Sequence, residues 1–72
     1  SLDIADLPQY RRDGAIIISK EHVTQPLPPP GTYRVRRILQ QASAQDIVDI
    51  EVGDDTICIP EAESLRELLF EA

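Results

Sequence analysis

Residues 47 to 59 read IVDIEVGDDTICI, a stretch that predicts two antiparallel strands joined by a tight turn. Positions 48, 50 and 52 are apolar and alternate with Asp49 and Glu51, so one face of the first strand should be buried and the other solvated. GDD at 53 to 55 supplies turn residues, and TICI at 56 to 59 is again rich in β-favouring residues. A hairpin of this kind places the chain among mainly β proteins.

A second β-favouring run lies nearer the N-terminus. AIIIS at residues 15 to 19 shows no alternation, which is typical of a strand covered on both faces and predicts the central strand of the sheet. It follows RRDG at 11 to 14, in which Gly14 favours a turn.

A third run, residues 32 to 40, carries an irregularity. Its alternation places Ile38 on the same side as the arginines. A β-bulge near Arg36 and Arg37 would turn both arginines outward and return Ile38 to the core. We therefore expect a bulge at this point.

The C-terminal segment predicts a helix over 60 to 72. Pro60 suits the first helical position, and acidic residues follow it at the positive end of the helix dipole. Ser64 and Glu67 also match a capping box, which would start the helix one turn later. The inner face would carry Leu65, Leu68, Leu69 and Ala72.

Taken together, the elements predict an α+β, mainly β fold. We expect a small antiparallel barrel of four to five strands, partly open, with a C-terminal helix, and its element order resembles the layout of the SH3 type. One domain covers residues 1–72, with an N-terminal arm or short helix at 1–13, barrel strands at 14–59 and the helix at 60–72. The chain starts at Ser1 and contains no methionine, which favours a domain excised from a longer protein.

Composition indicates a folded, cytoplasmic domain. Hydrophobic residues make up 42% of the 72 and charged residues 28%, the balance of a globular chain. The single cysteine, Cys58, cannot form an internal disulfide, and a secreted domain of this size normally needs several. The longest apolar run is far shorter than the roughly 20 residues that span a bilayer. We therefore expect a reducing, cytoplasmic setting and no membrane segment.

Charge divides the chain into two parts. Residues 1 to 45 carry six basic and four acidic residues, whereas residues 46 to 72 carry nine acidic residues against Arg66 alone. Two interpretations remain open: the two signs neutralise each other across a sheet, or they form a bipolar surface that recognises a partner.

Few residues offer chemistry. The only histidine, His22, and the only cysteine have no orienting signature of a catalytic pair, and two such residues are too few for a zinc site. The acids at 49, 51, 54 and 55 lack the loop pattern of a calcium site, and the glycines are too scattered to cradle a phosphate. We expect no enzyme activity, metal, cofactor or small-molecule substrate.

The segment TQPLPPPG at 24 to 31 predicts polyproline II backbone. It can serve as a ligand for a proline-binding module, or as a rigid corner that crosses one end of the barrel. Leu27, held outward between prolines, would then be an anchor for a partner.

These observations predict a noncatalytic interaction or oligomerisation domain of a larger cytoplasmic protein, with a homodimer as its favoured form. A helical Phe70 would lie about 140 degrees from Leu65 and miss the core, so it is a candidate contact. The predicted partner-binding residues are Leu27, Tyr33, Leu68 and Phe70. The alternative is a nucleic-acid-binding or transcription-regulatory module that uses Tyr33, Arg34, Arg36 and Arg37.

Overall fold

The computed structural model describes residues 1–41 and 44–71, and within them the regular secondary structure is β except for one short 3₁₀ helix. The elements are β1 (Leu2–Asp3), β2 (Tyr10–Arg12), β3 (Ala15–Ser19), the 3₁₀ helix η1 (Lys20–His22), β4 (Gly31–Leu39), β5 (Gln45–Val52), β6 (Thr56–Ile59) and β7 (Leu65–Phe70).

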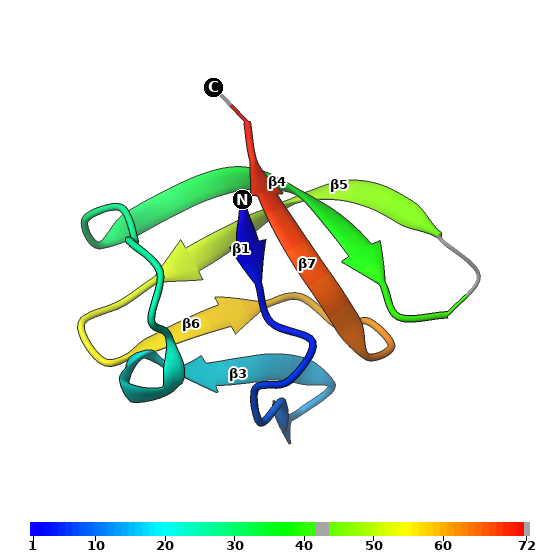
Figure 1. Ribbon diagram of the computed structural model, residues 1–72, viewed down its shortest axis with the longest axis horizontal. Helices are drawn as coiled ribbons and strands as arrows, with labels where there is room; N and C mark the ends of the chain where they lie inside the picture. The colour runs from blue at the N-terminus through cyan, green and yellow to red at the C-terminus, as the bar shows by residue number, and fades with distance from the viewer. Residues whose placement is uncertain (42–43, 72) are drawn as a thin grey trace.

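All described strands belong to one antiparallel sheet in the order β1-β7-β4-β5-β6-β3-β2. The sheet curls into a partly open barrel, with β7 and β1 on one side and β3 and β2 on the other (Figure 1). The consecutive strands β4, β5 and β6 form its middle. The prediction of a small, mainly β, partly open barrel is therefore confirmed, with seven described strands instead of four to five.

The core lies on the concave face of the curled sheet. Alternation decides its membership, since Ile50 and Val52 of β5 are buried while Asp49 and Glu51 between them are exposed. The hairpin predicted from residues 47 to 59 is therefore confirmed. The buried core consists of Leu2, Ile4, Ile16, Ile18, Val35, Ile50, Val52, Ile57, Ile59, Leu65 and Leu68.

The predicted C-terminal helix is wrong, because residues 65–70 form β7. Leu65 and Leu68 are buried as predicted, but through pairing with β4 and with β1. The spacing of the leucines fits a helix and an irregular strand equally well, and β4 would otherwise present a long unpaired edge. This long-range pairing outweighs the helical preference of the segment. Ala72 lies outside the described residues.

The N-terminal segment also differs from the predicted arm or short helix. It contributes both terminal strands of the sheet, β1 and β2, with a single turn between them in which the Leu7 N–H donates to the Ile4 carbonyl at 3.2 Å. Asp13 and Gly14 join β2 to β3 with φ of 50° and 86°. Positive φ at both central residues defines the tight hairpin turn that Asp-Gly favours.

The bulge lies close to its predicted position but does not turn both arginines outward. The pairing of β4 with β7 shifts between Ile38 and Leu39, where Ile38 faces Glu67 and Leu39 faces Leu65. Before that shift β4 alternates regularly, so Arg37 faces the interior together with Val35.

Two glutamine side chains close the gap at the open side of the barrel. The Gln9 side chain donates to the Leu65 carbonyl at 2.6 Å and accepts from the Leu65 N–H at 2.9 Å, as a neighbouring strand would. Gln40 donates to the same carbonyl at 3.1 Å. Side-chain amides thus replace backbone pairing there.

No helix in the described part of the chain has the length and apolar character needed to cross a bilayer.

Candidate interaction surface

The residues predicted to bind a partner line the inner face of one end of the barrel. Leu68 is fully buried, so its side chain does not reach the surface, and Leu27, Tyr33 and Phe70 are half-buried against the core. The Tyr33 and Phe70 rings meet edge to face with centroids 5.9 Å apart and an interplanar angle of 70°. Phe70 therefore packs against one end of the core and does not project from a helix. It was predicted as a contact residue because a helix would have exposed it, and that reason no longer applies.

The proline-rich loop is tied to this same end. The Tyr33 hydroxyl donates to the Pro29 carbonyl at 2.5 Å, and the Asp3 N–H donates to Gln25 Oε1 at 2.9 Å. Leu27 packs against the core between these two bonds and so faces inward. These two hydrogen bonds and the packing of Leu27 attach the loop to the barrel end.

Two of the three candidate nucleic-acid-binding arginines are paired on the outer face of the sheet. Arg34 Nε lies 3.3 Å from Asp49 Oδ1, and Arg36 Nη2 lies 3.6 Å from Glu71 Oε1. Asp49 and Glu71 belong to the acidic C-terminal part of the chain. Opposite charges therefore meet across neighbouring strands at these positions, as the first of the two charge interpretations expects.

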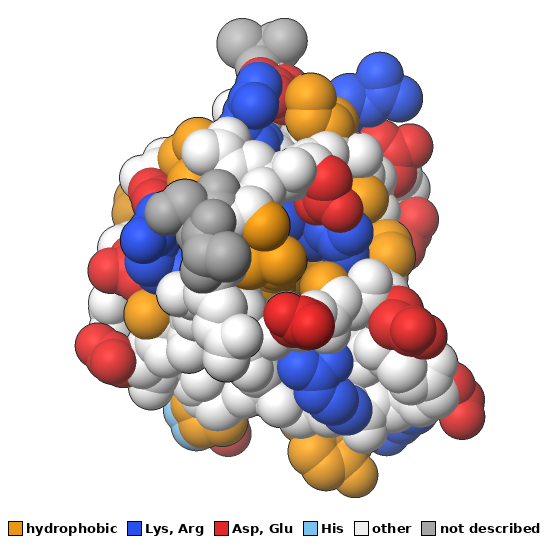
Figure 2. All heavy atoms as spheres, turned by 90° about the vertical axis from the view of Figure 1, so that its right-hand side faces the viewer, with side chains coloured by type: hydrophobic (Ala, Val, Ile, Leu, Met, Phe, Trp, Pro, Cys, Tyr) orange, Lys and Arg blue, Asp and Glu red, His pale blue; other side chains and the backbone are white. Residues whose placement is uncertain are grey.

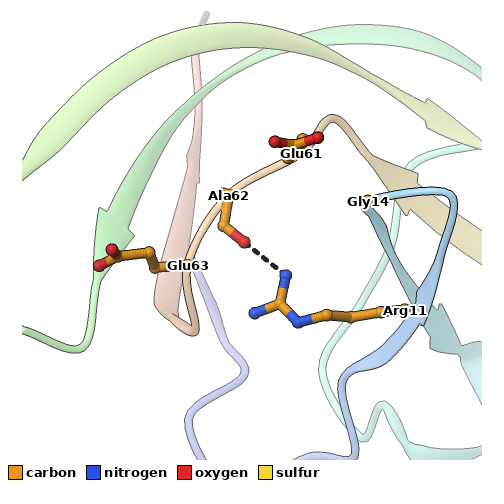
Figure 3. A pocket seen from close by; sticks show the side chains of 5 residues that line it. All are labelled: Arg11, Gly14, Glu61, Ala62 and Glu63. Carbon is orange, nitrogen blue, oxygen red and sulfur yellow. Dashed lines mark hydrogen bonds between the residues drawn. The ribbon is translucent and has the colours of Figure 1, made fainter.

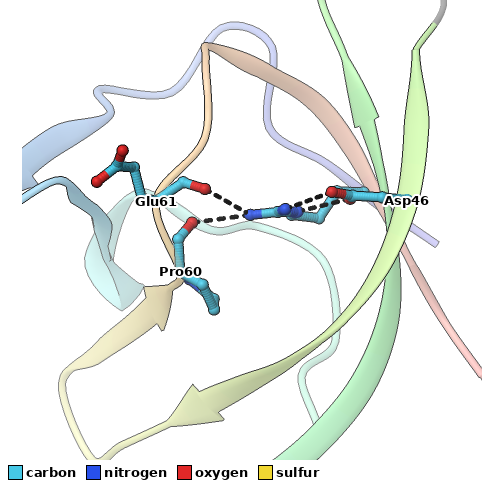
Figure 4. A network of polar contacts seen from close by, with 4 residues as sticks. Asp46, Pro60 and Glu61 are labelled. Atoms are coloured by element: carbon cyan, nitrogen blue, oxygen red, sulfur yellow. Dashed lines mark hydrogen bonds and ion pairs between the residues drawn. The ribbon is translucent and has the colours of Figure 1, made fainter.

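Arg37 is committed to the interior. Only 6% of the residue is exposed, and its Nε and Nη2 donate to the two Asp46 oxygens at 2.8 and 2.5 Å. Nη1 donates to the carbonyls of Pro60 at 2.8 Å and Glu61 at 3.1 Å, so the guanidinium joins β5 to the segment before β7 (Figure 4). Hydrogen bonds from Arg37, reinforced by its charge and opposed by burial, hold the pKa of Asp46 below its ordinary value. Four of the five N–H groups of Arg37 are thus used within the chain, so this buried side chain serves the structure and is not presented to a phosphate on the outer face.

The outer face of β2, β3 and β6 carries an apolar area, and none of its residues was predicted from the sequence as a contact residue. The register places Tyr10 opposite Ile17, and Ile17 opposite Cys58. Tyr10 is 64% exposed, whereas Ile17, Cys58 and the adjacent Ala15 are half-buried. We call Tyr10, Ala15, Ile17 and Cys58 the outer patch.

The sequence pattern of β3 explains why this patch is unusual. Ile16 and Ile18 are fully buried in the core, but Ile17 between them faces outward, and β3 lies next to the terminal strand β2. The prediction of a central strand is wrong, and within the described residues only one face of β3 is covered by a layer of the chain. Asp13-Gly14 was the available signal: a two-residue turn pairs Tyr10 with Ile17 directly.

A second exposed apolar residue lies on the same outer face, but on β5 and away from the outer patch. Ile47 of β5 is 50% exposed and stands opposite Arg36. Arg36 on β4 and Asp49 two residues along β5 are its charged neighbours on this face, so Ile47 is an isolated apolar residue and not part of an apolar patch.

The end of the barrel that faces the viewer in Figure 2 is hollowed, with apolar side chains near its centre and both signs of charge around them. Two adjoining depressions of about 530 and 290 Å³ share Arg11 and Glu63. In the larger one the Arg11 guanidinium reaches across to the Ala62 carbonyl, with Nη1 at 2.5 Å (Figure 3). Arg11 thus bridges the hollow, and neither depression is a deep enclosed cavity.

The side chains with catalytic or metal-binding chemistry can be located within residues 1–41 and 44–71. No group of three or more His, Cys, Asp or Glu side chains is placed to hold a metal ion there. His22 Nε2 lies 3.8 Å from Glu21 Oε1 on the exposed η1, and Cys58 belongs to the outer patch. The Asp46 carboxylate, whose pKa is lowered, serves Arg37.

Comparison with known proteins assigns no relatives. No family model, curated protein or solved structure matches this chain.

Proposed function

We propose that this chain is a noncatalytic interaction domain that assembles with a second copy of itself. One observation carries the proposal: β3 has the sequence of a strand covered on both faces, and the described residues cover only one of them with a layer of the chain. Ile17 and Cys58 therefore form apolar surface that a partner chain would remove from water.

The size of the domain supports this proposal. A chain of 72 residues buries a smaller share of its surface than a larger domain does, so its stability is modest. Full burial of a side chain such as isoleucine stabilises by roughly 1.5–3 kcal/mol relative to exposure, and the half-buried Ile17 would gain part of that on assembly. The gain is a sizeable fraction of the stability of a small domain.

The cellular setting remains part of the proposal. We place the domain in a reducing, cytoplasmic compartment as one part of a larger protein, because its single cysteine lies on the outer patch. An oxidising setting would favour modification of a half-buried thiol at this surface, or its linkage to a second copy.

The test is the mass in solution across concentration. Light scattering or sedimentation equilibrium between about 5 and 500 µM should show the mass rising from 8.1 kDa toward twice that value, as mass action requires. Ile17→Lys should hold the chain as a monomer, whereas Ile47→Lys, an equal change at an exposed position outside the patch, should not. A wild-type mass of one chain at every concentration would reject self-assembly.

A further inference from the structure

We infer that the second copy docks face to face on the outer patch, with Arg12 and Tyr10 of one copy over Glu51 of the other. This inference rests on the proposed function and adds the arrangement of the two chains. It starts from the order of side chains across the sheet, which is Tyr10, Ile17, Cys58 and Glu51 on β2, β3, β6 and β5.

The row is apolar in its middle and polar at its two ends. Ile17 and Cys58 occupy the centre, and the flanking outward pairs Arg12 with Ala15 and Ser19 with Thr56 add no charge on β3 or β6. Positive charge enters from β2, through Arg12, and negative charge from β5, through Glu51 and Asp49, of which Asp49 already pairs with Arg34. A patch with opposite charges at opposite ends is complementary to itself.

A two-fold axis running along the strands between β3 and β6 uses this complementarity. It lays Ile17 of one copy over Cys58 of the other, and Tyr10 over Glu51. Arg12 lies two residues from Tyr10, about 7 Å along the strand, a distance that an extended arginine spans. An axis across the strands along this row would instead lay each strand over its own copy and oppose Glu51 to Glu51, which repulsion disfavours.

Both charged residues are available for such a contact. Arg12 is exposed and makes no ion pair within residues 1–41 and 44–71. Glu51 is exposed, and the Thr32 hydroxyl donates to its Oε1 at 2.7 Å, which orients the carboxylate on the outer face. The chain as a whole carries a net charge of −6, so two copies repel each other except where a basic residue meets an acidic one.

Charge reversal tests the arrangement. Arg12→Glu and Glu51→Arg should each raise the dimer dissociation constant about tenfold, and the double variant should return to within about threefold of wild type. Arg66→Glu, an equal charge change on the exposed part of β7, controls for net charge.

Chemical cross-linking gives a second readout. Sheets packed about 10 Å apart with strands about 4.8 Å apart place the two Cys58 Cα atoms roughly 11 Å from each other. Because Cys58 is the only cysteine, a short bismaleimide should produce a covalent dimer in the wild type, and far less of it in Ile17→Lys. Circular dichroism of every variant establishes that it is folded before its mass is interpreted.

Each outcome separates the two proposals. A monomeric wild type removes self-assembly altogether. A dimer that Ile17→Lys disrupts, but that the double charge reversal does not restore, keeps self-assembly and overturns the Arg12–Glu51 arrangement. A dimer that is insensitive to Ile17→Lys and not cross-linked through Cys58 overturns the outer patch as the docking surface.

Discussion

Replacing Asp46 with asparagine should destabilise the fold far more than the same change at Asp49. Both carboxylates accept hydrogen bonds from arginines of β4. Their partners differ: the side chain of Arg37 is 8% exposed, whereas that of Arg34 is 69% exposed. The paired variants therefore compare a buried guanidinium with a solvated one at matched positions of the same two strands.

The magnitude follows from the contacts. Asp46 binds Arg37 through two charge-assisted bonds, of which asparagine retains one acceptor and loses the charge. A hydrogen bond to a charged group contributes about 1.5–3 kcal/mol, and the carboxylate is 53% exposed, so we take the lower part of that range. The buried guanidinium is left with a neutral partner. We expect Asp46→Asn to lower the unfolding free energy by about 2 kcal/mol and Tm by about 10 °C.

The assay is urea unfolding followed by far-ultraviolet circular dichroism at several pH values. Because the folded pKa of Asp46 lies below its unfolded value of about 3.9, its stabilisation is present above that pH and is lost as pH falls through the folded pKa. The difference between wild type and Asp46→Asn should therefore be largest near neutral pH and shrink in acid. Asp49→Asn should cost about 0.5 kcal/mol or less at any pH.

Two results would refute this reasoning. Equal losses for the Asp46 and Asp49 variants would show that burial of the arginine does not decide the energy. A difference between wild type and Asp46→Asn that persists undiminished at acid pH would show that the charge of Asp46 is not the stabilising element.

Three further changes probe the closure and the end of the barrel. Gln9→Ala should lower the free energy of unfolding by about 1–3 kcal/mol, because it removes the side chain that bonds the Leu65 N–H and carbonyl. Hydrogen exchange of the Leu65 amide should become faster, and unchanged exchange would contradict this. Phe70→Ala should cost about 3 kcal/mol in thermal unfolding through lost core packing and the Tyr33 ring contact, and a surface-like loss below about 0.5 kcal/mol would contradict its placement. Gly14→Ala should cost about 1 kcal/mol, because its φ of 86° strains any residue with a Cβ, and a stabilised variant would speak against that backbone.

How far the sequence predicts the fold depends on whether a signal is local. Residues 47 to 59 carry alternation and turn residues side by side, so their hairpin was predictable. The β7 segment LRELLF has no local feature that separates strand from helix, and only its pairing with β4 decides the matter. Local spacing therefore could not predict β7.

The candidate site shows the same division. Arg37 was read as an outward residue because arginines are rarely buried, whereas the regular alternation of β4 carries it inward to Asp46. Tyr10 was overlooked because RRDG was interpreted as a loose turn instead of the two-residue link of a hairpin. The unbroken apolar run of β3 was interpreted as a central strand covered on both faces, whereas among the described strands β3 lies next to the terminal strand β2 and only Ile16 and Ile18 are fully buried.

The strand order has a consequence for when the chain can fold. The middle strands β4 to β6 are consecutive in sequence, so they can pair through short turns. In contrast, β1 pairs Leu2 with Leu68 of β7, near the other end of the chain. Loops that long close slowly, so β1 joins last although it precedes the other strands in the chain, whereas β2 pairs locally with β3. On a ribosome, Leu2 and Ile4 must wait as exposed apolar residues until β7 has emerged, and the short β1 limits what can pair wrongly in the meantime.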